Sequence, residues 1–84
     1  MNEQERSLVD YTLDVAHRCA AFRHFSVRDA IKALRLANAM LADDGYAPIN
    51  GSPSSLSRIE METLERAIHI IDYLSDTQAK RLLH

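Results

Sequence analysis

Residues 56–74, with the sequence LSRIEMETLERAIHIIDYL, are the longest stretch in which apolar side chains recur at helical spacing without a glycine or a proline. At about 100° per residue, these side chains fall within one broad arc of an α-helix. The apolar set is Leu56, Ile59, Leu64, Ala67, Ile68, Ile70, Ile71 and Leu74, and the opposite side carries Arg58, Glu62, Glu65, His69 and Asp72. We expect the rest of the chain to pack against the apolar arc.

A serine and a proline mark the expected start of this helix. Ser52 is suited to cap it, and Pro53 is tolerated in the first turn, where its missing N–H would have no partner. The helix is therefore predicted over residues 53–74. The sequence Ser75-Asp-Thr-Gln then has the pattern of a capping box. This pattern predicts a short fourth helix over residues 76–83, or a bend in one continuous helix.

The N-terminal part of the chain carries the pattern of two further helices. The first is predicted over residues 3–22, with apolar side chains on so wide a surface that it should touch two neighbours. The second is predicted over residues 27–42, and Ser26 followed by Asp29 resembles a capping box with a shorter acid. Its main apolar stripe, which should face the core, consists of Val27, Ala30, Ile31, Leu34, Ala37 and Leu41.

The second helix is expected to stop at a glycine. Gly45 can adopt the left-handed conformation that ends many helices. Residues 43–52 are predicted to form the one long loop, and this region with Pro53 holds all the glycines and prolines of the chain. We expect an ordered loop, held by the apolar side chains of Tyr46 and Ile49.

The length of 84 residues fits a single domain over residues 1–84, with a core that is small on its own. Together with the helical periodicity, this predicts an all-α fold, a compact three-to-four-helix bundle. Cys19 is the only cysteine, so no internal disulfide can form and a reducing cytoplasm is expected. Self-association is the remaining way to complete a small core, and we expect a homodimer.

The helix over residues 27–42 has a second apolar face. Leu36 and Met40 lie roughly opposite Leu34 on this helix, and Ala33 lies nearby. A chain of this length has little material left to cover both faces. The predicted partner or dimer interface therefore consists of Leu36, Met40, Ala33, Tyr73 and Phe22.

The charges of the chain are mixed along its length. Ten basic and 12 acidic residues give a net charge of −2, and no block of one sign exceeds two residues. A nucleic-acid partner is therefore disfavoured. The polar start of the chain lacks the features of a signal peptide, and no window approaches the roughly 20 apolar residues of a membrane span. We expect a soluble cytoplasmic protein that does not contact a membrane.

The polar residues give no pattern of a catalytic or metal site. None of the four histidines stands three or four residues from another histidine or from the cysteine, so neither a metal nor another cofactor is expected. Glu60 lies inside the apolar arc, where it could pair with Arg35 or act as a buried functional carboxylate. We expect the first role, and no enzymatic activity.

Residues 25–34, FSVRDAIKAL, resemble the support helix of helix-turn-helix DNA-binding domains, with a serine cap and an alanine at the crossing point. The resemblance implies a DNA-binding transcriptional regulator. The chain departs from the motif after this stretch, where helix-forming residues continue and Asp43 and Asp44 follow instead of a basic recognition helix. The preferred hypothesis is a protein–protein interaction module with a regulatory or accessory role, and the helix-turn-helix regulator is the alternative.

Overall fold

The described part of the chain folds into three α-helices and one short 3-10 turn. The computed structural model describes residues 1–19 and 25–82. In chain order the elements are α1 (Glu3–Cys19), α2 (Val27–Asp43), η1 (Pro53–Ser55) and α3 (Arg58–Leu82), and no strand occurs in the described ranges. The all-α prediction is confirmed, and of the predicted three to four helices the described residues form three.

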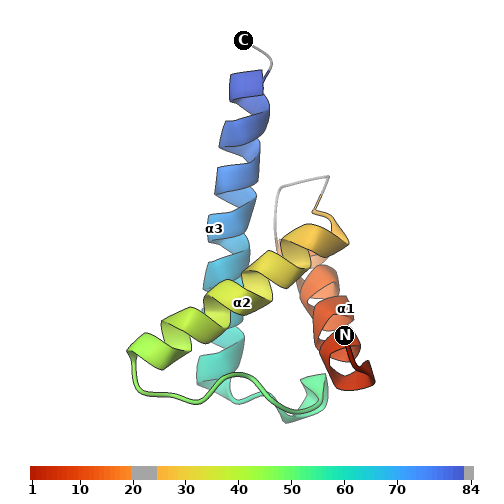
Figure 1. Ribbon diagram of the computed structural model, residues 1–84, viewed down its shortest axis with the longest axis vertical. Helices are drawn as coiled ribbons and strands as arrows, with labels where there is room; N and C mark the ends of the chain where they lie inside the picture. The colour runs from red at the N-terminus through yellow and green to blue at the C-terminus, as the bar shows by residue number, and fades with distance from the viewer. Residues whose placement is uncertain (20–24, 83–84) are drawn as a thin grey trace.

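The longest helix sets the length of the molecule. α3 has 25 residues, which corresponds to about 37 Å, and the longest dimension of the molecule is 42 Å. α2 runs obliquely across α3, and α1 packs mainly against α2 (Figure 1). The C-terminal half of α3 projects beyond both of the other helices (Figure 1).

The core is built around small side chains on α2. Ala30, Ala33 and Ala37 are completely buried, and Leu41 is buried at the end of the same face. Since alanine has no side-chain atom beyond Cβ, this face lets the neighbouring helices approach closely. The other helices supply the larger core side chains, which are Leu8, Val9 and Val15 of α1 and Leu64 and Ile68 of α3. The predicted core stripe of α2 is wrong at Val27, which is 50% exposed.

The apolar arc of residues 56–74 is only partly covered. Leu64, Ala67 and Ile68 are buried as predicted, whereas Ile59, Ile70 and Leu74 are 40%, 38% and 50% exposed. Ile70 and Leu74 lie toward the half of α3 that projects beyond α1 and α2 (Figure 1). The arc therefore contains both core and surface residues.

The start of α3 differs from the prediction. Ser52 and Pro53 open η1 instead, and Leu56 then takes an extended conformation. α3 begins after Ser57, whose hydroxyl accepts a hydrogen bond from the backbone N–H of Glu60 (3.3 Å), while the Glu60 carboxylate accepts one from the N–H of Ser57 (2.9 Å). This reciprocal capping box satisfies two N–H groups that otherwise lack partners. The predicted pairing of Glu60 with Arg35 is thus replaced by a contact with the backbone.

We expect the Ser57→Ala substitution to lower the free energy of unfolding by about 1 kcal/mol, because it removes a helix cap. Glu60→Gln should cost less, since glutamine can occupy the same capping position. Urea denaturation followed by circular dichroism measures both. Ser54→Ala is the matched control, because the Ser54 hydroxyl contacts the exposed Ser52 hydroxyl (2.9 Å) and caps no α-helix. Equal losses in the free energy of unfolding for the Ser54 and Ser57 variants would contradict the assignment of Ser57 as the cap of α3.

The two ends of the chain also bear on the predicted boundaries. α3 continues to Leu82, so the predicted fourth helix over residues 76–83 is wrong. In an unbroken helix the backbone N–H groups of this segment bond to the preceding turn, so no new helix begins there. α1 ends at Cys19, and the last part of the predicted helix 3–22 lies outside the described residues.

Both ends of α2 follow the prediction closely. At the start, Ser26 and Asp29 form a complete capping box. At the end, Gly45 has a φ of +84°, and the N–H of Tyr46 reaches the carbonyl of Leu41 (2.8 Å). With the bond from the Gly45 N–H to the Ala42 carbonyl (3.0 Å), this is a Schellman motif.

The loop after α2 is attached to the helix by a single residue. Ile49 is buried, and its N–H donates a hydrogen bond to Oδ1 of Asn38 on α2 (2.9 Å). Tyr46, the other predicted anchor, is 48% exposed. The loop therefore holds its place through one apolar side chain and one side-chain amide.

Candidate interaction surface

The structure describes four of the five residues of the predicted interface. Ala33 is completely buried, so it offers no surface to a partner, and Leu36 and Met40 are half-buried against the core. Tyr73 is 71% exposed. Phe22 lies outside the described residues. The four described residues therefore range from completely buried to largely exposed.

The size of the α2 side chains explains this outcome. At roughly 100° per residue, Leu36 and Met40 fall on one side of Ala33 around the helix. The other buried alanines fall on its other side. Because that face allows a close approach of helices, the flanking side chains of Leu36 and Met40 also reach the core. Most of the second apolar face of α2 is thus used within the chain.

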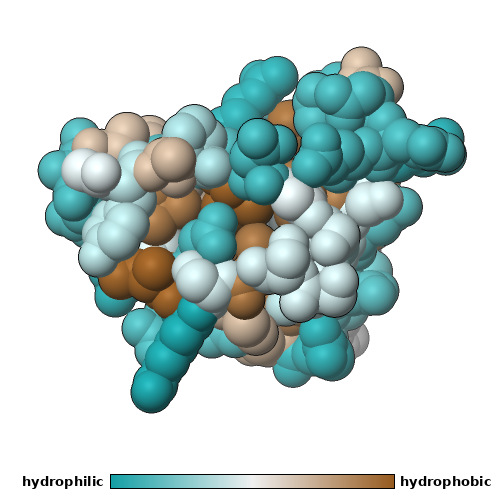
Figure 2. All heavy atoms as spheres, turned by 90° about the horizontal axis from the view of Figure 1, so that it is seen from below, coloured by the Kyte–Doolittle hydropathy of each residue, from teal (hydrophilic) through white to brown (hydrophobic). Residues whose placement is uncertain are grey.

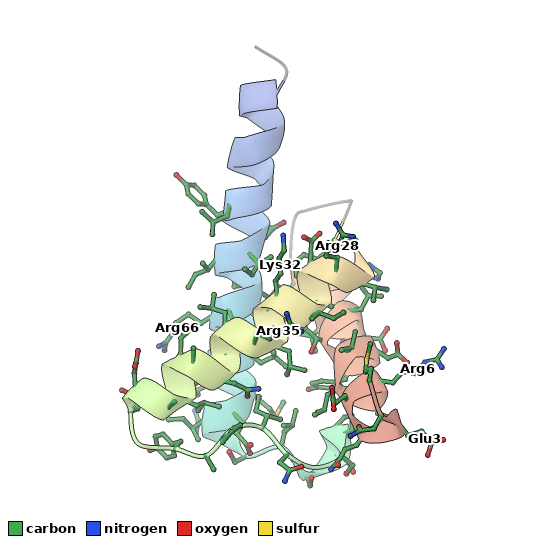
Figure 3. The ribbon with its side chains drawn as sticks, viewed as in Figure 1. Glu3, Arg6, Arg28, Lys32, Arg35 and Arg66 are labelled. Carbon is green, nitrogen blue, oxygen red and sulfur yellow. The ribbon has the colours of Figure 1, made fainter. Side chains whose placement is uncertain are left out.

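A larger exposed apolar surface lies on α3. The side chains of Ile59, Ile70 and Leu74 fall within about 60° of one another around the helix, and Arg66 falls beside them. Figure 3 shows Arg66 on the side of α3 that is turned away from α1. We call this surface the α3 outer face, and it consists of Ile59, Glu62, Arg66, Ile70, Tyr73 and Leu74.

The charges of the α3 outer face are only weakly engaged within the chain. Glu62 forms an ion pair with Arg58, with 3.1 Å between Oε1 and Nε. The Glu62 side chain is 55% exposed and the Arg58 side chain is 93% exposed. So exposed a pair contributes little to stability, because water screens it. No carboxylate among the described side chains forms an ion pair with Arg66. The face therefore presents apolar side chains together with charges of both signs.

A second surface feature is a groove of about 300 Å³ between α1, α2 and the loop. Its floor includes Leu8, Ile49 and the half-buried Leu34, and its rim includes Glu5 of α1 and Arg35 of α2. We call it the α1–α2 groove. Seen from the lower end of the molecule, hydrophobic side chains lie recessed between hydrophilic ones (Figure 2).

The histidines and acids do not converge. His17 and His69 are exposed on α1 and α3, and His24 and His84 lie outside the described residues. Within residues 1–19 and 25–82, no three histidine, cysteine, aspartate or glutamate residues are arranged to hold a metal ion. Glu60 is occupied as part of the α3 cap, so its position inside the apolar arc needs no catalytic explanation.

The stretch that resembles a helix-turn-helix support helix lies mostly within one continuous helix. α2 runs through residue 34 to Asp43, and α3 begins only at Arg58. Residues 44–57 separate the two helices, which is far longer than the roughly 3–4-residue turn of the motif. The geometry of a helix-turn-helix is therefore not formed at this stretch.

No helix in the described part of the chain is long and apolar enough to cross a membrane. Comparisons with protein-family models, curated proteins and solved structures find no match for this chain. The function is accordingly argued from the surface of the chain itself.

Proposed function

We propose that the protein is a non-catalytic protein–protein interaction module that acts as a homodimer in a regulatory or accessory role. The observation that carries this proposal is the α3 outer face, on which Ile59, Ile70 and Leu74 are each between 38% and 50% exposed. Burying apolar surface is the main favourable term in protein association, and grouped apolar side chains at a surface are typical of interaction sites.

The charges of the α3 outer face favour a second copy of the chain as the occupant. In a dimer with two-fold symmetry, the same face of both copies meets and the residues pair reciprocally. If two α3 helices pack antiparallel about an axis near Leu64, Glu62 lies opposite Arg66 of the second copy. The same register places Ile59 within one residue of the position opposite Ile70 of the second copy. The face is therefore complementary to itself in both charge and apolar surface.

The size of the domain supports the same proposal. A chain of 84 residues buries a small core, and a dimer would add the α3 outer face to the surface removed from water. In this register the two α3 helices overlap between Ile59 and Ile70, which gives about 17 Å of contact along the helix.

Multi-angle light scattering tests the dimer. Wild-type protein should have about twice the chain mass of 9.5 kDa, and the double variant Ile70→Ser, Leu74→Ser should have the mass of one chain. Its helical content by circular dichroism should remain, because both side chains are partly exposed, serine and isoleucine have similar helix propensities, and the change from leucine to serine costs less than about 0.7 kcal/mol.

Val27→Ser is the matched control, since Val27 is as exposed as Leu74 but lies on α2. This variant should remain a dimer. A wild-type mass of one chain that persists as the concentration is raised from micromolar to millimolar would refute the dimer. Loss of the dimer in the Val27 variant would show that the α3 outer face is not its specific site.

A further inference from the structure

Three basic side chains follow one another along the exposed side of α2. Arg28, Lys32 and Arg35 are all exposed and are spaced by four and three residues, so they share one side of the helix over about 10 Å (Figure 3). None of the three forms an ion pair with a described carboxylate. We call this row the basic stripe. In a chain with a net charge of −2, it is a local excess of positive charge.

The nearby acids of α2 do not neutralise the basic stripe. Asp29 accepts hydrogen bonds from the N–H and the hydroxyl of Ser26, both at 3.0 Å, and so serves the helix cap. Asp43 and Asp44 lie at the opposite end of α2. The stripe therefore has charge available for a partner.

The basic stripe borders the α1–α2 groove. Arg35 belongs to both, and Ile31 and Leu34, half-buried side chains of the groove, lie on the neighbouring side of α2. A ligand on this surface would meet cations along one edge and apolar side chains along the other. An amphipathic helix offers this combination, with apolar residues about every third or fourth position and charges beside them.

We propose that the α1–α2 groove and the basic stripe together bind an acidic amphipathic helix of a protein partner. Its apolar side chains lie against Ile31 and Leu34, and its carboxylates lie over Arg28, Lys32 and Arg35. This inference rests on the proposed interaction function and names the chemistry of the partner. It uses a surface distinct from the α3 outer face, so a dimer could bind one such helix on each copy.

A helical peptide fits this surface better than nucleic acid does. Protein–DNA affinity comes largely from phosphate contacts, often 6–10 of them, and the stripe supplies three cations. Asp43 and Asp44 at the end of α2 would repel a continuous phosphate backbone. The apolar side of the groove would remain unused.

The experiment begins with selection of a displayed library of randomised helical peptides against the full chain. Enriched peptides should carry aspartate or glutamate at helical spacing beside an apolar row. The affinity of the best peptide is then measured by fluorescence anisotropy. Replacing its apolar row with serine, or its acids with amides, should abolish or strongly weaken binding.

Two triple variants of the protein distinguish the effect of the basic stripe on peptide affinity from the effect of net charge. The stripe variant carries Arg28→Gln, Lys32→Gln and Arg35→Gln, and the control carries Arg6→Gln, Arg18→Gln and Arg58→Gln, which are exposed residues of α1 and α3. Both lose three positive charges. The stripe variant should bind the peptide about tenfold or more weakly, which corresponds to about 1.4 kcal/mol, and the control should bind nearly as wild type does.

Three results would overturn the inference. They are enriched peptides without an excess of acids, equal losses of affinity in the two triple variants, and tighter binding of a double-stranded DNA fragment than of the best peptide. Light scattering on the same samples keeps the proposals apart, because the stripe variant should still be a dimer. A monomeric wild type that binds acidic peptides as described would refute only the dimer.

Discussion

Replacing Ile68 by alanine is expected to lower the free energy of unfolding by about 2–5 kcal/mol. The Ile68 side chain has no exposed surface and lies in the cluster formed by all three helices. Truncation would remove buried apolar atoms and leave a cavity, and both effects destabilise the fold. For so small a domain this is a large part of the total stability. Urea denaturation followed by circular dichroism gives the value.

Ile70→Ala is the matched control for the Ile68 variant. It makes the same chemical change two residues further along α3, at a side chain that is 38% exposed, and should cost less than about 1 kcal/mol. Unfolding should be followed at several protein concentrations, because a loss that arises from self-association depends on concentration. Equal concentration-independent losses for the two variants would contradict the division of the apolar arc into core and surface.

The second large effect is expected from Ala33→Leu. Ala33 has no exposed surface on the face of α2 where Ala30 and Ala37 are also completely buried. A leucine there would force the packed helices apart, which typically costs about 1–3 kcal/mol. Thermal and urea denaturation measure this loss, and the helix propensity of leucine is close enough to that of alanine to contribute little.

Ala39→Leu is the control for this substitution, because Ala39 lies on the exposed side of the same helix. Its effect should stay within about 0.5 kcal/mol. If the Ala33 variant were as stable as the Ala39 variant, Ala33 would not be a close-packing position. The sequence-based prediction of Ala33 as an interface residue would then regain support.

Helix boundaries could be predicted where the signal is local. The serine and acid at Ser26 and Asp29 give the start of α2, and Gly45 gives its end, because caps depend only on neighbouring residues. The start of α3 was harder, since Ser52-Pro53 and Ser57-Arg-Ile-Glu60 are both plausible starts. Only the second forms the reciprocal capping box, and the first opens a 3-10 turn.

The exposed surfaces could not be predicted in the same way. Periodicity gives the direction in which the apolar side chains of a helix point, but their burial depends on the length and position of the other helices. Ile70 and Leu74 have the spacing of core residues and remain exposed on α3. Leu36 and Met40 were expected to lie at a surface, and the close approach along the alanine face of α2 draws them toward the core. The basic stripe was not predicted from the sequence, and the groove beside it forms only where α1 packs against α2.

The attachment of Ile49 to Asn38 has a consequence for the chain entropy of the loop. Residues 44–57 would otherwise form one long connection between α2 and α3, and ordering a backbone costs about 1–2 kcal/mol per residue. Fixing Ile49 divides this connection into two short segments. The segment before it follows the end of α2, and the segment after it leads to η1. Since the entropy of closing a loop rises only with the logarithm of its length, by about 0.6 kcal/mol per doubling, evolution could lengthen the second segment at little cost while the first stays short.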